Sequence, residues 1–224
     1  MKKILLSILV IILLPLAYSC GTLRYALTEN DAASAIRQLL SIGARENNLA
    51  GAFSKETILA TLFPQPVQKA LNTLNMLGLT GEIDRFTTTL SAAAEKTATA
   101  SIPVFENSIN HIKFSDAIRI VKNGGTAATD YLRVSAGDTL RRSIRPIMQS
   151  TLDEYKLNEQ WNNIIKPAKA IAGNKLNLDL ATLMAGAVSE AMFRKIAEKE
   201  VLVRKDVSAR STALLQKVFS GNYQ

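Results

Sequence analysis

The stretch that decides the fold is LDLATLMAGAVSEAMFRKIAEKEVLVR, residues 178–204. Glu190 and Arg194, like Glu200 and Arg204, stand four residues apart, the spacing at which opposite charges on one helix pair. Apolar side chains at this spacing indicate an α-helix that packs one face against a core. They recur at Leu180, Met184, Val188, Met192 and Ile196. The stretch therefore predicts one long, half-buried helix.

The rest of the chain repeats this helical pattern. A second stripe starts at Ala128 and resumes after Pro146, where we expect a kink. Thr28 is placed to cap the first helix, and Pro103 to separate two helices. No convincing period-two alternation, which would indicate strands, is present. The sequence predicts an all-α fold, a single compact multi-helix domain over residues 28–220, with shorter helices expected within residues 54–62 and 66–77.

The stretch NGGTAATDYLR, residues 123–133, holds two glycines, two threonines, an acid, a phenol and a guanidinium. Two glycines after a helix suit a turn, because glycine adopts positive φ at no steric cost. Thr126 is placed to accept a hydrogen bond from an early N–H of the next helix, and Asp130 to pair with Arg133. A tight corner between two helices, the first capped by Ser115, explains the stretch.

The same corner could hold a ligand. Free N–H groups at a helix start attract anions, and tyrosine and arginine side chains add donors. The charge of Asp130 would repel a phosphate unless Arg133 neutralises it. An open cleft shared with a second buried acid would favour an enzyme, whereas mutually satisfied side chains at a surface corner would favour a binding or structural role. The candidate ligand-binding residues are Thr126, Thr129, Asp130, Tyr131, Arg133 and Arg210.

The N-terminus has the pattern of a secretory signal peptide. A basic start is followed by an apolar run at residues 4–17, and Ala17-Tyr18-Ser19 leads to Cys20, the only cysteine. The run is shorter than the ~20 apolar residues of a membrane-spanning helix. The pattern resembles a bacterial lipobox, in which the signal is cleaved before a cysteine that carries a diacylglycerol. The alternative is an ordinary secreted protein with a chance cysteine.

The lipobox resemblance implies a division of the chain and a location. Residues 1–19 would be the signal peptide and residues 20–27 a lipid-anchored tether, with the membrane as a partner through Cys20. Several acyl chains, each buried CH₂ contributing ~0.8 kcal/mol, would hold the protein to a leaflet. No aspartate stands next to the cysteine, so a bacterial sorting rule favours the cell envelope at the periplasmic face of the outer membrane.

The charge of the chain does not indicate nucleic-acid binding. The formal net charge is +8, and loss of Lys2 and Lys3 with the signal would leave +6. The basic residues are dispersed, and an envelope protein has no nucleic-acid partner to meet. The densest run, Arg141 to Arg145, follows Asp138 and alternates with apolar helix positions. We interpret it as a solvated helix face, with a weak preference for anionic head groups or murein-linked acids as the alternative.

Catalytic and cofactor motifs are missing from the sequence. The only histidine is His111, for which a structural or solvated role is expected, and lipidation would consume the only thiol. A zinc hydrolase, a catalytic thiolate and a disulfide are therefore not expected. No G-x-S-x-G elbow, phosphate-binding loop or dinucleotide fingerprint occurs. We expect no metal and no cofactor.

Three stretches together resemble a known family. They are LFPQPVQK at residues 62–69, GGTAATDYLR at residues 124–133 and ARSTALLQKVF at residues 209–219. In order and spacing they look like segments of the bacterial envelope family called domain of unknown function 4197, across roughly residues 28–220. The resemblance implies an all-helical, secreted or lipid-anchored protein. It implies no activity, because no function or catalytic residues are established for the family.

Two functions follow from these observations. The first is a lipid-anchored cell-envelope protein that acts as a non-enzymatic binding or structural module. It would take a partner protein or a small apolar or anionic ligand between helices. The second is a hydrolase or transferase with a carboxylate, tyrosine and arginine site around residues 126–133. The lone histidine and the missing motifs favour the first.

Overall fold

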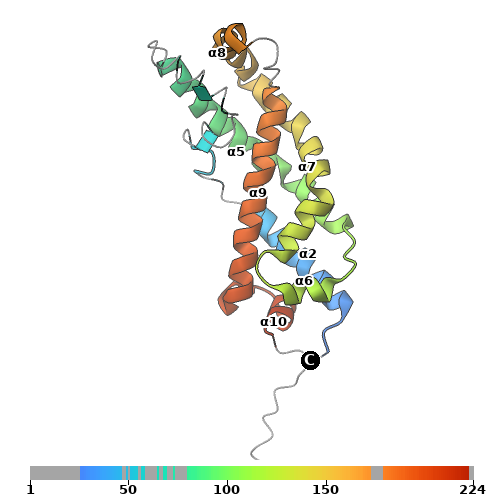
Figure 1. Ribbon diagram of the computed structural model, residues 1–224. Coiled ribbons are helices and arrows are strands. Elements are labelled where there is room, and N and C mark those ends of the chain that lie inside the picture. The colour runs from blue at the N-terminus through green and yellow to red at the C-terminus, as the bar shows by residue number, and fades with distance from the viewer. Residues whose placement is uncertain are drawn as a thin grey trace, which may run out of the picture.

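The computed structural model describes residues 26–46, 80–172 and 179–221, with short pieces between 49 and 73. Every regular element in these parts of the chain is a helix, which confirms the all-α prediction there (Figure 1). The predicted signal peptide and Cys20 lie outside the described residues, as do most of the tether and of the two short helices expected between residues 54 and 77. The elements are α2 (Glu29–Arg45), α5 (Thr80–His111), α6 (Ala117–Asn123), α7 (Ala127–Glu154), α8 (Leu157–Ala172), α9 (Leu180–Lys205), the 3₁₀ helix η4 (Val207–Ala209) and α10 (Ala213–Phe219).

The long helices α7 and α9 lie side by side, and α5 packs against both at an angle to α9, with α2 packed against α9 and α5 (Figure 1). The short helices α6 and α10 contact α2 at one end of the molecule, and α8 lies at the other end (Figure 1). The corner of residues 123–133, which joins α6 to α7, therefore lies at the α6 and α10 end.

Within the described residues, no helix combines the length and the apolar character that a membrane crossing requires.

Helix α9 forms the centre of the core, as its apolar stripe predicts. All five residues of the stripe are buried. Phe193, one position further along the helix, is fully buried, and its ring meets that of Phe105 of α5 edge to face with centroids 5.3 Å apart. Helix α9 also packs closely against α2 at Gly43, where any larger residue would bring its Cβ to only 3.1 Å from the Cα of Ile196. The backbones of α2 and α9 are therefore in close contact.

Prolines lie within the helices α5, α7 and α8, contrary to one expectation. Pro103 was expected to separate two helices, but α5 continues through it to His111. The proline is exposed, whereas Ser101 and Phe105 on either side of it are buried. An interior proline costs about 3 kcal/mol, similar to the gain from burying one large apolar side chain. Helix α7 likewise continues through Pro146, which is also exposed.

The starts of α2 and α6 show two kinds of cap. Thr28 caps α2 as predicted, because its Oγ1 accepts a hydrogen bond from the N–H of Asp31 at 3.1 Å. Helix α6 is capped by Asp116 and not by Ser115. The carboxylate of Glu29, from the first turn of α2, also accepts the N–H of Ala117 at 2.7 Å. A long-range acidic cap thus joins α2 to the start of α6.

The basic run on α7 is a paired, outward-facing surface, as interpreted from the sequence. Arg141 pairs with Asp138 on the same helix, and Arg145 Nη2 lies 2.7 Å from Asp179 Oδ2 at the start of α9. Burial of Asp179 opposes its ionisation, but hydrogen bonds from Thr182 and Arg145 outweigh burial and lower the pKa of Asp179 below its ordinary value. The run therefore helps to hold α7 to α9.

Candidate functional site

The corner after α6 has the backbone geometry that its glycines predict. Gly124 and Gly125 have φ angles of +73° and +56°. Only glycine adopts such angles without strain, so the pair turns the chain from α6 into α7. A Cβ built on either residue meets no atom within 4 Å. The space beside the turn is therefore open.

Thr126 does not cap α7, which corrects the prediction from the sequence. Its side chain accepts no hydrogen bond from an early N–H of the helix. Its hydroxyl donates instead to Asp130 Oδ2 at 2.8 Å. Asp130 therefore has Thr126 as its partner, where Arg133 was expected.

The start of α7 is capped by Glu200, a residue of α9. Its carboxylate is fully buried. One oxygen accepts the N–H of Ala128 at 2.9 Å, and the other accepts the N–H and the hydroxyl of Thr129 at 2.8 and 2.6 Å. A carboxylate at this place also meets the positive end of the helix dipole. The N–H groups that were expected to be free for an anionic ligand therefore donate to the carboxylate of Glu200.

Arg204, one turn after Glu200 on α9, supplies the counter-charge. Its Nη2 and Nε donate to Glu200 Oε1 at 2.7 and 3.0 Å, which confirms the predicted i,i+4 pair. Its Nη1 and Nη2 also donate to the carbonyls of Val121 and Ile120 at the end of α6, at 2.8 and 3.1 Å. The guanidinium lies over the ring of Phe219, 5.1 Å from its centroid. Glu200 and Arg204 together connect α6, α7, α9 and α10.

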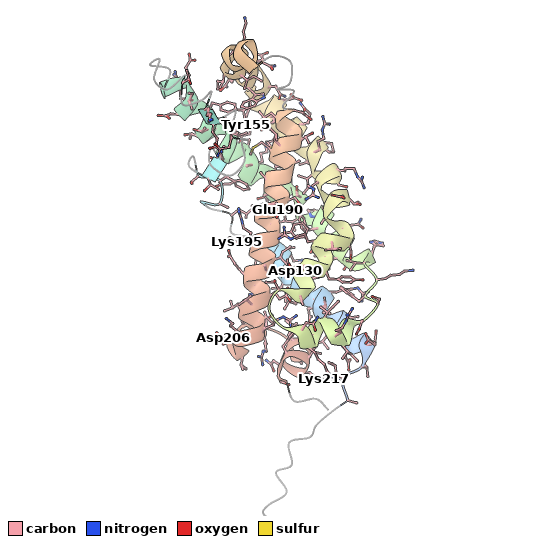
Figure 2. All side chains as sticks on the ribbon, viewed as in Figure 1. Asp130, Tyr155, Glu190, Lys195, Asp206 and Lys217 are labelled. Carbon is pink, nitrogen blue, oxygen red and sulfur yellow. The ribbon has the colours of Figure 1, made fainter. Side chains whose placement is uncertain are left out.

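Arg133 lies further along α7 and has partners of its own. It forms an ion pair with Glu190 of α9, and its guanidinium lies 4.6 Å from the centroid of the Phe193 ring. The second partner of Glu190 is Arg141, at 3.7 Å, and not Arg194 as its spacing suggested. Figure 2 labels Asp130 on α7 and Glu190 on α9, whose partners are Thr126 and Arg133 respectively.

Tyr131 and Arg210 both donate to backbone carbonyls. The hydroxyl of Tyr131 donates to the carbonyl of Lys113 at 2.8 Å. Arg210, buried after η4, donates from Nε to Val203 at 2.9 Å and from Nη2 to Arg204 at 3.0 Å. It thereby closes the C-terminal end of α9, where cations are favourable.

The six predicted residues are thus not brought together as one site. Thr126 and Asp130 contact each other, while Thr129, Arg133 and Arg210 each join a different partner. A direct role of the six in binding a ligand stays a prediction. As a set, the six neither converge in one open cleft nor satisfy one another at the surface, so neither outcome set out from the sequence is met.

A pocket opens beside the two glycines, between the end of α6 and the C-terminal part of α9. Its volume is about 320 Å³, near the small end of ligand pockets. Sequence reasoning missed the two cations in its lining, because no local signal places the end of α9 beside the corner. The described lining consists of Val121, Gly124, Gly125, Val201, Arg204, Lys205, Phe219 and Gly221.

A second pocket, of about 630 Å³, lies between α5 and α8. Among its described lining residues, Ile164 alone is apolar, and the others are polar or charged. A ligand site usually combines apolar walls with a few convergent polar groups. The smaller pocket has this combination, and we take it as the candidate binding site.

The residues that the structure describes offer no metal site. No three of their histidine, cysteine, aspartate or glutamate side chains come together. His111 is exposed, and its Nδ1 lies 2.7 Å from the carbonyl oxygen of Asn107 on its own helix. This geometry agrees with the solvated role expected for His111.

One comparison with known proteins gives a match. A family model described as "Protein of unknown function (DUF4197)" matches residues 26–220. Neither a curated protein nor a solved structure matches the chain. The matched range contains Glu200 and the described lining of the candidate pocket up to Phe219.

Proposed function

Because the chain belongs to the family of proteins of unknown function DUF4197, whose description names no activity, we propose its function from the site itself. The protein is a lipid-anchored component of the bacterial cell envelope that binds a small ligand without transforming it. The observation that carries the binding role is the candidate pocket, in which apolar walls meet Arg204 and Lys205. Such a combination suits a ligand with an apolar part and an anionic group.

The lining of the candidate pocket supports binding over catalysis. Its described residues provide no carboxylate, hydroxyl, thiol or imidazole, the groups that most often act as base or nucleophile. Glu200, the acid that pairs with the lining residue Arg204, is fully buried and holds the start of α7. Asp130 and Tyr131, which the hydrolase or transferase alternative requires, bond to Thr126 and to a backbone carbonyl. No observation favours that alternative.

The pocket can be tested by filling it. We expect native mass spectrometry of the lipidated protein, extracted into nanodiscs, to show a retained small molecule that Val201→Trp abolishes, because Val201 lines the pocket. Val134→Trp is the matched control, since Val134 is 88 % exposed on α7. It should retain the molecule. The same retained mass in all three proteins would show that the molecule binds elsewhere.

The anchor rests on the sequence alone and has its own test. Cys20 follows an apolar run and is the only thiol available for acylation. We expect wild-type protein to incorporate a clickable fatty acid in a bacterial host and to fractionate with the outer membrane. Cys20→Ala should lose the label and the membrane association, whereas Thr22→Ala should keep both. An unlabelled wild-type chain would refute the lipid anchor.

A further inference from the structure

The two cations of the candidate pocket do not contribute equal charge to it. The charge of Arg204 is balanced by the buried carboxylate of Glu200, at 2.7 and 3.0 Å. Its hydrogen bonds use four of the five guanidinium N–H groups. Arg204 therefore offers the pocket one remaining donor and almost no net charge.

Lys205 supplies the net charge. Its side chain is exposed, and no residue in the described part of the chain pairs with its ammonium. The next residue, Asp206, is engaged elsewhere: its Oδ1 accepts the N–H and the hydroxyl of Ser208, both at 2.8 Å. These bonds lower the pKa of Asp206 below its ordinary value. The described lining thus carries one uncompensated positive charge and no acid.

The rest of the pocket is apolar or open. Val121, Val201 and Phe219 form its walls, and Phe219 also holds the Arg204 guanidinium in place. The turn at Gly124 and Gly125 borders it without side chains. A ligand could place an apolar part against these walls and a polar head toward Lys205.

We propose that the pocket selects a small amphiphile with a single negative charge, such as a carboxylate or a phosphodiester. This inference rests on the binding function proposed above and names the ligand class. An uncharged head would leave Lys205 without a partner. A dianionic phosphomonoester would bring a second charge for which the described lining has no uncompensated cation, which is unfavourable in a partly desolvated site.

Three eight-carbon probes separate these cases. Octanoate carries one charge, octanol none and octyl phosphate two at pH 8.5. Calorimetric titrations use the lipidated full chain in phosphatidylcholine nanodiscs, with empty nanodiscs as the blank. We expect octanoate to bind about tenfold tighter than octanol and at least as tightly as octyl phosphate. Octyl phosphate binding tenfold tighter than octanoate, or octanol equal to octanoate, would overturn the proposal.

Two variants assign the charge preference to the pocket. Lys205→Gln should weaken octanoate about tenfold and leave octanol within about twofold, because only the headgroup contact is lost. Lys113→Gln makes the same change at an exposed lysine before α6, outside the pocket lining, and should leave both affinities unchanged. Equal loss in the two variants would contradict the assignment to Lys205.

The source of the anion is separated by a second nanodisc composition. With phosphatidylglycerol added, loss of octanoate binding would identify a bilayer phosphodiester as the occupant, and unchanged binding would identify a free monoanion. Failure of all three probes in both compositions, together with no retained molecule in native mass spectra, would count against the binding function itself. If the probes bind but their affinities do not follow the order expected above, only the proposed ligand class is overturned.

Discussion

Replacing Glu200 with glutamine is expected to lower the free energy of unfolding by about 3 kcal/mol or more, as for other broken buried ion pairs. The variant leaves the Arg204 guanidinium, only 10 % exposed, without its counter-charge. It also turns one carboxylate oxygen into an NH₂ group that faces N–H donors of Ala128 and Thr129 or of Arg204 itself. For a chain of this length the melting temperature should fall by about 6–12 °C.

The matched control for this variant is Glu198→Gln, two residues earlier on the same helix. The Glu198 side chain is 63 % exposed and pairs with Lys195. Exposed pairs of this kind contribute about 0–1 kcal/mol, so the control should unfold close to wild type. Urea denaturation followed by far-UV circular dichroism measures both. Equal urea midpoints for the two variants would show that the hydrogen bonds of Glu200 to α7 and to Arg204 do not stabilise the fold.

Truncating Phe193 to alanine should cost about 3–5 kcal/mol, the range for large aromatic side chains removed from a core. The ring is fully buried where α9 meets α5 and α7. It packs edge to face on Phe105 and carries the Arg133 guanidinium on its face. The substitution therefore removes an apolar contact, an aromatic pair and a cation–π contact together.

Phe193→Leu separates the loss of volume from the loss of the ring. It retains most of the buried apolar volume and should cost less than about 1.5 kcal/mol. The same denaturation measurement applies to both variants. If the leucine variant were as unstable as the alanine variant, the aromatic contacts with Phe105 and Arg133 would dominate over packing.

The helices were predictable because their signal is local. The apolar stripe of α9, the Thr28 cap and the glycine turn at residues 124–125 each depend on neighbours within a few positions, and the structure has all three. Pro103 was misjudged for the opposite reason. A proline disfavours a helix locally, but buried neighbours on α5 hold the helix through it, and their burial depends on distant segments.

The candidate site was only partly predictable. The corner was located correctly, but its cap was assigned to Thr126 when it comes from Glu200, 71 positions beyond Thr129. The spacing of Glu200 and Arg204 predicts an ion pair whether the pair is exposed or buried, so it did not show that the pair anchors two helix ends. No pattern in the sequence around Lys205 indicates that this residue lines a pocket.

The acidic and basic groups that close the helix ends at this corner also constrain how the chain folds. The start of α6 depends on Glu29, the end of α6 on Arg204 and the start of α7 on Glu200, across sequence separations of 88, 83 and 71 residues. A helix as short as α6 is not stable alone in water, and contacts this distant form only after long loops close. The α6–α7 corner therefore cannot be completed as the chain is synthesised residue by residue. It is completed only once α9 has been synthesised and has docked against the corner.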